Sequence, residues 1–312
     1  MIRTENITKT YRNGYQAVKG LSLQVDQGDL FGFLGPNGAG KTTTIRMLDG
    51  LLEPTSGSVY IDGMDIQRQP EAIKQRIGVV PESHGYYYWM TAREYLQYFS
   101  ALFHRRDADI DGLLDRVGLA EKKDVTVGQF SRGMKQRLGI AKSLVNRPKI
   151  IFLDEPTLGL DPRGQREIQQ LLLDISHNDG ITVFITSHML KDIEVLCNRV
   201  CIVNDGRMIE QGTLPGLKAK YMRNYTMTIR TTDDQRALPV MRSIASIQSA
   251  RMTAEGVEIT LEEGLPDPAV NHIKHQLLAE IFTHGIDITE MAHKSLSIED
   301  IFFRATETGG GK

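Results

Sequence analysis

The chain has 312 residues, with 37 Lys and Arg against 39 Asp and Glu and a formal net charge of -2 at pH 7. This length allows two domains, and the balanced charge gives no basic field that would favour nucleic acid as a partner. No apolar run approaches the roughly 20 residues of a membrane-spanning helix, and Met1–Glu5 lack the apolar core of a signal peptide. We therefore expect a soluble, intracellular protein that reaches a membrane only through a partner.

The first residues predict two short strands with a tyrosine between them. Apolar positions favour strands over Ile2–Ile7 and, around a turn, over Gln16–Val25, and Tyr11 lies between them. Aromatic rings bind bases through their faces without hydrogen bonds, so Tyr11 could stack on a nucleobase. A tyrosine at the end of a strand is more often ordinary packing, and this residue alone leaves both interpretations open.

The segment from Leu30 to Leu52 predicts a buried strand, a glycine-rich turn and the start of a helix. Leu30–Leu34 is short, apolar and bounded by glycine, as expected for a central parallel strand. The next residues fit the phosphate-loop pattern G-x-x-x-x-G-K-[ST] and its continuation, namely Gly35, Pro36, Asn37, Gly38, Ala39, Gly40, Lys41, Thr42 and Thr43.

The residue types of this loop have a chemical reason. Glycines let successive backbone N–H groups turn inward around an anion, and the helix that begins near Lys41 adds its positive N-terminal end. Lys41 would reach the β- and γ-phosphates of a nucleotide, and the Thr42 hydroxyl would bind Mg²⁺. The loop predicts nucleotide binding before any other motif is considered.

The chain after the loop continues with strands and turns and then becomes mainly helical. The expected elements are a helix to Leu52, strands over Ser58–Ile61 and Ile77–Val80, a short helix over Glu71–Arg76, and helices over Thr91–Phe103, Ile110–Val117 and Met134–Val145. Apolar residues recur at helical spacing in the last part. We expect a helical subdomain over about residues 83–145, inserted into an α/β domain.

Two acids follow the next buried strand. Ile150–Leu153 is apolar and leads directly into Asp154 and Glu155. Beside a phosphate loop, Asp154 could bind Mg²⁺, and Glu155, which points differently along the strand, could orient or deprotonate the attacking water. The alternative is a pair of solvated acids, which an apolar strand and an upstream phosphate loop disfavour. His188 follows a further strand, Thr182–Thr186.

The last third of the chain predicts the end of this domain and a second, smaller one. The expected elements are helices over Arg163–His177 and Leu190–Cys197, a hairpin of Arg199–Val203 with Arg207–Glu210, and a linker over Gly212–Lys220. Alternating and helical patterns then predict a small α+β domain over residues 218–304, without a catalytic constellation. Residues 305–312 are expected to form a disordered tail.

A third motif indicates the family. Gln129–Arg137 contains Ser131, Gly133 and Met134 and precedes the strand that ends in two acids. Together with Tyr11, the phosphate loop, Glu82, Asp161 and His188, it makes residues 1–215 resemble the ATP-binding cassette (ABC) ATPases, with every expected motif in the expected order. The resemblance implies a P-loop NTPase cassette over residues 1–217, with a mixed sheet core and the helical subdomain.

The resemblance also implies ATP and Mg²⁺ as cofactors and a role for each motif. Lys41, Glu155 and His188 would be catalytic, with His188 sensing the γ-phosphate, and Thr42, Glu82 and Asp154 would bind the metal. Ser131, Gly133 and Met134 would bind the γ-phosphate held by another subunit. Because one chain carries one copy of each motif, two cassettes would pair head to tail, with Asp161 in the loop that crosses the interface.

Two features depart from the usual family pattern. Phe130, Arg132 and Met134 replace three residues of the usual signature Leu-Ser-Gly-Gly-Gln. Glu82 stands where the γ-phosphate-sensing loop usually has Gln, and its charge would change the electrostatics at the γ-phosphate. These departures, with Met90-Thr91 and the C-terminal stretch 295–302, resemble bacterial cassettes of drug, antibiotic and sodium exporters that pair with a separate permease.

Tyr86, Tyr87, Tyr88 and Trp89 follow the sensing loop directly. They form either the start of a partly buried helix or a docking surface for the permease, because exposed aromatics are enriched at interface cores. We expect the energising subunit of an exporter, peripheral on the inner face of the cell membrane. The alternatives are a soluble ABC-type ATPase and a non-catalytic nucleotide-binding regulator. The sequence does not identify the transported substrate.

Overall fold

The computed structural model describes residues 1–83, 85–221, 225–262, 265–293 and 296–309. Its contacts divide the chain into a first unit, Met1–Leu214 with Phe302–Lys312, and a second unit, Pro215–Ile301. The sequence predicts this division at residues 217/218 and does not predict that the end of the chain groups with its beginning. None of the helices in the described ranges combines the length and apolar character that crossing a membrane requires.

A six-stranded sheet forms the centre of the first unit. Its order is β11-β10-β4-β9-β8-β7, parallel from β10 to β7 and antiparallel at β11. The strands are β4 (Leu30–Leu34), β7 (Ile77–Val80), β8 (Ile150–Asp154), β9 (Thr182–Ser187), β10 (Arg199–Asn204) and β11 (Arg207–Thr213). All residues of β4, β8 and β9 are buried, because parallel strands in the middle of a sheet are covered on both faces.

The N-terminal residues form a second, antiparallel sheet in the order β2-β1-β5-β6, with β3 also pairing with β1. The strands are β1 (Ile2–Thr10), β2 (Gln16–Leu21), β3 (Gln24–Val25), β5 (Ser56–Ile61) and β6 (Met64–Asp65). Strand β1 is longer than the sequence predicts and ends directly before Tyr11. The following turn to β2 returns the chain beside it, with Thr10 opposite Gln16.

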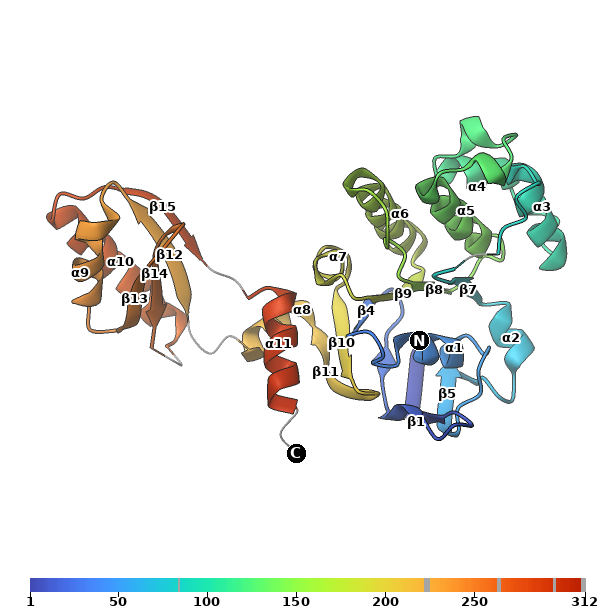
Figure 1. Cartoon of the computed structure of the whole chain (residues 1–312), viewed down its shortest axis with the longest axis horizontal. Coiled ribbons are helices and arrows are strands. Elements are labelled where there is room, and N and C mark those ends of the chain that lie inside the picture. The colour runs from blue at the N-terminus through green and yellow to red at the C-terminus, as the bar shows by residue number, and fades with distance from the viewer. Residues whose placement is uncertain (84, 222–224, 263–264, 294–295, 310–312) are drawn as a thin grey trace. The chain divides into compact units, whose positions relative to one another are not determined.

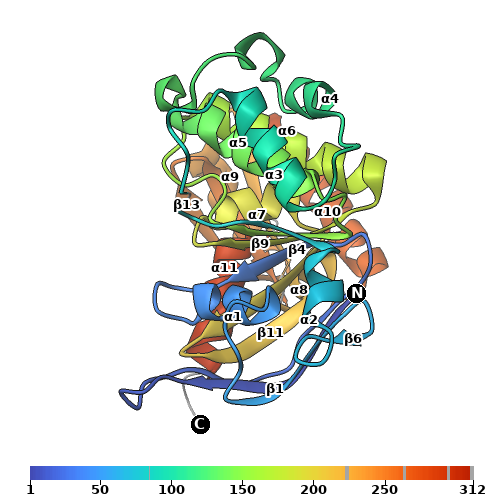
Figure 2. The same cartoon turned by 90° about the vertical axis from the view of Figure 1, so that its right-hand side faces the viewer.

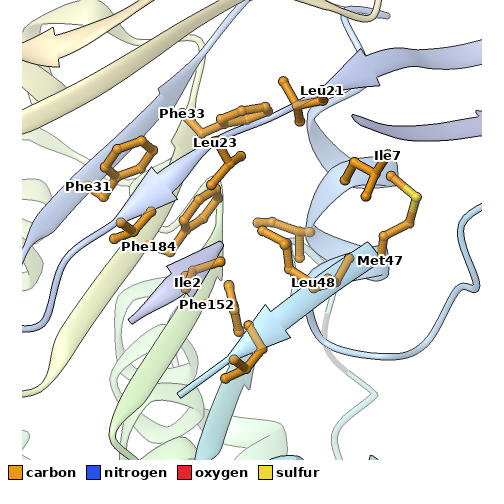
Figure 3. Packing of buried hydrophobic residues seen from close by; sticks show 14 of the residues in the cluster. Ile2, Ile7, Leu21, Leu23, Phe31, Phe33, Met47, Leu48, Phe152 and Phe184 are labelled. Atoms are coloured by element: carbon orange, nitrogen blue, oxygen red, sulfur yellow. The ribbon is translucent and has the colours of Figure 1, made fainter. Parts of the chain in front are cut away.

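The core lies between the two sheets and the helix α1 (Lys41–Leu48), and its middle is aromatic (Figure 3). Phe31 and Phe33, two residues apart, lie on the same face of β4, and both pack on Phe184. Their ring centroids lie 5.4 and 5.5 Å, respectively, from that of Phe184. Phe152 packs on the same ring at 5.6 Å. On the other face of β4, a Cβ on Gly32 would lie 2.7 Å from Ile193 Cγ2, so glycine lets α7 (Leu190–Leu196) pack closely there.

Helix α1 ends at Leu48, earlier than the predicted Leu52. Asp49 follows it with its side chain turned inward, and its Oδ1 accepts a hydrogen bond from Leu51 N at 2.9 Å. Gly50 then takes a positive φ of 79°, which stops the helix. Asp49 is 5% exposed, and burial raises the pKa of its carboxyl from 3.8 to about 6, against the opposing effect of Arg46.

This buried carboxyl makes a prediction about stability and pH. Because the folded chain holds the Asp49 proton more tightly than the unfolded chain, stability should rise as the pH falls from about 6 towards 4, the range between the two pKa values. Asp49→Asn should therefore raise the midpoint of thermal unfolding at pH 8, by an amount equivalent to about 2–3 kcal/mol, and the gain should shrink towards pH 5. Thermal unfolding of both proteins at these two pH values tests this. A gain of the same size at both would contradict the assignment.

A layer of helices covers the other side of the six-stranded sheet from α1 (Figures 1 and 2). They are α3 (Ala92–Leu102), α4 (Ile110–Arg116), α5 (Arg132–Leu144), α6 (Pro162–Asp179) and α7. The short α2 (Pro70–Lys74), between β6 and β7 in the chain, lies on the side of α1. Each long helix begins at a side-chain cap. Thr91 forms a capping box with Glu94, and Ser131 and Asp161 accept bonds from Met134 N and Gly164 N.

The second unit is an α+β fold in the order β-α-β-β-α-β, the ferredoxin-like arrangement. Its elements are β12 (Thr226–Thr231), α9 (Asp234–Arg242), β13 (Ile247–Thr253), β14 (Gly256–Leu261), α10 (Asp267–Thr283) and β15 (Ile288–His293). The antiparallel sheet has the order β13-β14-β12-β15, and both helices cover one face of it (Figure 1). Ile229, Ile259 and Leu277 are fully buried in a core of its own.

Two elements near the division differ from the prediction. The expected linker over Gly212–Lys220 contains the end of β11 and a helix, α8 (Leu214–Tyr221), whose Leu214 and Leu217 are buried. The expected disordered tail from residue 305 is instead helical to Gly309, because α11 (Ile298–Gly309) continues past a buried Ala305. Residues 310–312 of that tail, and Ser295 of the C-terminal stretch, lie outside the described residues.

Candidate functional site

The phosphate loop follows β4 and turns into α1. Gly38 and Gly40 have φ of 83° and 94°, in the left-handed region that favours glycine. A Cβ at Gly35 would lie 2.5 Å from the carbonyl oxygen of Val203, and one at Gly40 equally close to that of Ala17. The loop is therefore packed against β10 and β2, and these two positions leave room for backbone only.

Lys41 lies inside the curve of the loop and is 8% exposed. Its Nζ donates to the carbonyl oxygens of Gly35 at 2.8 Å and Pro36 at 3.3 Å, and lies 3.9 Å from Glu155 Oε1. Burial lowers the pKa of the ammonium, while the nearby carboxylates of Glu155, Asp154 and Glu82 act in the opposite direction. The Lys41 ammonium therefore lies in the electrostatic field of three carboxylates.

Asp154 is the last residue of β8, and its carboxylate is hydrogen-bonded to the phosphate loop and to β9. Thr42 Oγ1 donates to Asp154 Oδ2 at 3.1 Å, and Thr186 Oγ1, from β9, donates to the other oxygen. A hydroxyl and a carboxylate that meet in this way are oxygen ligands of the kind that Mg²⁺ takes together with substrate phosphates. In the described part of the chain, no three or more His, Cys, Asp and Glu side chains converge as a complete metal site.

Glu155 and His188 form a direct contact. His188 Nδ1 lies 2.9 Å from Glu155 Oε2, and the backbone N of His188 donates to the same oxygen at 3.3 Å. The Glu155 side chain is 9% exposed and that of His188 is 40% exposed. Glu155 has a positive φ of 52°, which is uncommon for a residue with a side chain, and its N–H donates to Thr186 O.

These residues surround one cavity of about 460 Å³, within the usual range for small-molecule sites. It lies beyond the carboxyl ends of β4, β7 and β9, as expected for a parallel sheet. The lining residues are Tyr15, Ala17, Asn37, Gly38, Gly40, Lys41, Thr42, Thr43, Glu82, Glu155, Leu158 and His188. Most of the predicted site residues thus meet at one place, although they come from widely separated parts of the chain. Among the predicted phosphate-loop residues and acids, those that do not line the cavity are Gly35, Pro36, Ala39 and Asp154, and Asp154 is connected to it through Thr42.

The structure places Tyr15 on the cavity and Tyr11 beside it. Tyr15 is 53% exposed, and its hydroxyl donates to Gly38 O at 3.4 Å. Tyr11 instead contacts the side chain of Thr43, with its hydroxyl 3.1 Å from the Thr43 Oγ1. Tyr15, Ala17 and Leu158 line the cavity and are not predicted from the sequence. The signal available for Tyr15 was a second tyrosine just beyond the turn at Gly14.

The signature residues lie elsewhere in the unit. Ser131, Gly133 and Met134 form the first turn of α5, across the sheet from α1 (Figure 2), and none of them lines the cavity described above. Ser131 is exposed. The Arg132 guanidinium packs on Gly159, where a Cβ would lie 2.6 Å from its Cζ. The signature residues and the cavity thus lie at separate places in one copy of the chain.

The four aromatics after Glu82 differ in exposure. Trp89 and Tyr88 are 72% and 53% exposed, and Tyr87 is partly exposed and packs edge-on against Tyr98. Tyr86 is buried, and its hydroxyl donates to Lys135 O in α5 at 2.5 Å. The expectation that Tyr86 takes part in a docking surface is therefore wrong, because this side chain fixes the loop to α5.

Comparison with known proteins decides the family. A family model described as ABC transporter matches residues 18–158. The chain is also 38% identical to the bacitracin transport ATP-binding protein BcrA of Bacillus licheniformis, over 100% of this chain and 98% of that protein. The chain is a member of the ABC transporter ATP-binding family. This ABC ATPase therefore binds and hydrolyses ATP, as the phosphate loop and its acids predict.

Further relatives and solved structures support the same family assignment. This ABC ATPase is 32% identical to the linearmycin resistance ATP-binding protein LnrL of Bacillus subtilis (strain 168), over 98% of each chain. It is 34% identical to the Nod factor export ATP-binding protein I of Ralstonia nicotianae, over 98% and 94%. The cassette MJ0796, solved as a dimer bound to ADP and Pi, is 29% identical with a TM-score of 0.62, over 69% of this chain and 99% of that one. The predicted P-loop NTPase fold is confirmed.

Proposed function

We propose that this ABC ATPase is the energising subunit of a membrane exporter. Two copies bind two ATP molecules between them, head to tail, and hydrolysis reopens the pair. Closing and opening drive a separate permease, which holds the otherwise soluble chain at the inner face of the membrane. The second unit is an accessory domain that follows the cassette near residue 217.

The separation of the cavity from the signature residues carries the dimer proposal. Ser131 is the exposed cap of α5, and its backbone neighbours present free N–H groups at the positive end of that helix. Such a terminus suits a phosphate, but in the described part of the chain the cavity formed by the phosphate loop is not lined by this terminus. A second copy would supply one, and a two-fold arrangement then completes both sites at once.

Within each cavity, the proposed roles follow the contacts. The loop amides and Lys41 would bind the phosphates, since the Lys41 ammonium can exchange its two carbonyl partners for phosphate oxygens. Thr42 and Asp154 would hold Mg²⁺, and the exposed Glu82 would add a carboxylate ligand on the open side. Tyr15, on the lining, is better placed than Tyr11 to stack on the base.

The acid–base step is assigned to Glu155 and His188. A carboxylate 9% exposed that contacts an imidazole can accept a proton from a water molecule on its cavity side. His188 would keep the carboxylate oriented and contact the γ-phosphate through the rest of its ring. The strained backbone of Glu155 is typical of residues at functional sites.

The exporter assignment is supported by the relatives. Those named for bacitracin transport, linearmycin resistance and Nod factor export match this chain over nearly its full length. The permease would dock on the exposed aromatics Tyr87, Tyr88 and Trp89, at the edge of the helical subdomain. Lys135 lies over the Tyr88 ring at 5.1 Å, which links this surface to the signature helix.

A docking test follows from this surface. Trp89→Ala and Tyr87→Ala should leave the ATP hydrolysis of the isolated chain within about twofold but lower the amount of permease that co-purifies from solubilised membranes about tenfold. The matched control is Phe282→Ala, an aromatic residue 55% exposed in the second unit, which should co-purify like the unaltered chain. Unchanged co-purification of both variants would reject this surface as the docking site. Absence of any multi-helix membrane protein with the unaltered chain would reject the exporter function.

A further inference from the structure

A buried carboxylate, Asp192 in the first turn of α7, joins three segments around the catalytic pair. It is 7% exposed, and both of its oxygens are used. Thr157 Oγ1 donates to Oδ2, and Gln169 Nε2, from α6, donates to Oδ1 at 3.1 Å. Thr157 is itself only 2% exposed. No catalytic or binding role assigned above uses these three side chains.

Thr157 and Asp192 lie close in the sequence to the two proposed catalytic residues. Thr157 follows Glu155 by two residues, and Asp192 follows His188 by four. The segment after β8 and the segment after β9 are therefore fastened twice, once at the Glu155–His188 contact and once behind it at Thr157–Asp192. Gln169 adds α6, whose N-cap is Asp161 in the loop expected to cross the dimer interface.

We propose that Asp192 is a positioning residue for ATP hydrolysis, acting through Thr157 on Glu155 and through α7 on His188. A buried carboxylate is costly unless its oxygens are hydrogen-bonded, so both donors hold it in one orientation. Hydrogen bonds restrain direction more tightly than apolar contacts do. The restraint is needed here because Glu155 has a left-handed backbone, which persists only when its surroundings hold it.

The opposite side of Glu155 is already fixed by β9, where Thr186 O accepts the Glu155 N–H at 3.1 Å. Without the Thr157–Asp192 bond, the segment after Glu155 would lose its buried side-chain connection to α7 and keep the bond to β9 and the Glu155–His188 contact. The carboxylate could then move relative to His188 and the attacking water. Displacements of about 1 Å at a reacting group can cost up to a hundredfold in rate. The phosphate loop is attached elsewhere, so nucleotide affinity should not change.

The test is Thr157→Val, which keeps the shape and removes the donor. We expect kcat for ATP to fall about tenfold or more while the dissociation constant for ATP stays within about twofold. Thr157→Ser keeps the hydroxyl and should restore kcat to within about threefold. Asp192→Ala removes the same bond and also the one from Gln169, so it should lower kcat at least as much as Thr157→Val. The double variant should be no worse than Asp192→Ala, because the Thr157–Asp192 bond is already lost in that variant.

Thr4→Val is the matched control for stability. Thr4 is a threonine 3% exposed in β1 whose hydroxyl donates to Leu21 O at 3.0 Å and accepts from Leu23 N at 2.9 Å. It should lose a comparable amount of thermal stability and keep its kcat. If Thr157→Val retains kcat, if Thr157→Ser loses as much as Val, or if Thr4→Val loses kcat equally, the positioning role is wrong.

The inference rests on the proposed roles of Glu155 and His188. One further variant distinguishes a failure of those roles from a failure of the positioning role of Asp192. Glu155→Gln is measured in the same series. Retained hydrolysis in Glu155→Gln would overturn the proposed site and the positioning role with it. Loss in Glu155→Gln together with full activity in Thr157→Val would overturn the positioning role alone.

Discussion

Glu155→Gln should lower steady-state ATP hydrolysis at least about a hundredfold and leave ATP binding intact. The glutamine amide occupies the same volume but cannot accept a proton from water. Its oxygen can still accept the His188 backbone N–H, so the local structure should persist. The Lys41 contacts with Gly35 and Pro36, which do not involve Glu155, should continue to order the phosphate loop.

If ATP closes the pair and hydrolysis reopens it, as proposed, the same variant should accumulate as an ATP-bound dimer. Size-exclusion chromatography with light scattering, with and without ATP and Mg²⁺, measures this. Glu71→Gln is the control, since that carboxylate is 81% exposed on α2 and pairs with the exposed Lys74. Hydrolysis by Glu155→Gln within threefold of the unaltered chain would reject Glu155 as the base. ATP binding without hydrolysis in the unaltered chain would favour the nucleotide-binding regulator.

Two inactive variants, mixed, should recover activity. Lys41→Ala removes the ammonium from the cavity, and Ser131→Arg blocks the exposed cap of α5, so each alone should hydrolyse ATP less than about a hundredth as fast. In a head-to-tail pair, each site combines the phosphate loop of one copy with the signature of the other. A mixed dimer therefore has one doubly damaged site and one intact site. Random pairing at equal concentrations should restore about a quarter of the full rate.

A second mixture is the control for this complementation. Lys41→Ala with Glu155→Gln should stay inactive, because Lys41 and Glu155 belong to the same copy at each site, 3.9 Å apart. Every site in that mixture then carries one defect. Recovery in both mixtures would show that the activity does not come from an intact site shared between two copies. Recovery in neither would contradict a site shared between two chains.

The residues that could be predicted from the sequence are those whose role is indicated by their immediate neighbours in the chain. The phosphate loop is a continuous pattern, and its glycines are required by backbone angles within the loop itself. Asp154 and Glu155 follow an apolar strand, and that order alone places them at a strand end. The central strand β4 and the edge strand β7 begin and end at the predicted residues, because short apolar strands bounded by turns have sharp limits.

What the sequence could not provide depends on contacts between distant segments. Tyr86 and Trp89 are neighbours in one aromatic run, yet one is buried against Lys135 and the other is exposed, which only the position of α5 decides. Tyr15 replaces Tyr11 on the cavity because of how the β1–β2 turn folds back. The Thr157–Asp192 bond joins residues 35 apart, and neither belongs to a recognisable motif.

The grouping of Phe302–Gly309 with the first unit has a consequence for synthesis. A ribosome releases the N-terminal residues first, and domains generally fold as they emerge. Here Phe302–Gly309, which include the buried Ala305, group with the first unit, although the second unit, Pro215–Ile301, lies between the two parts in the chain. The first unit can therefore add these turns only after the second unit has been translated. For the same reason, a recombinant fragment cut at residue 217 would leave uncovered the surface that these last turns protect.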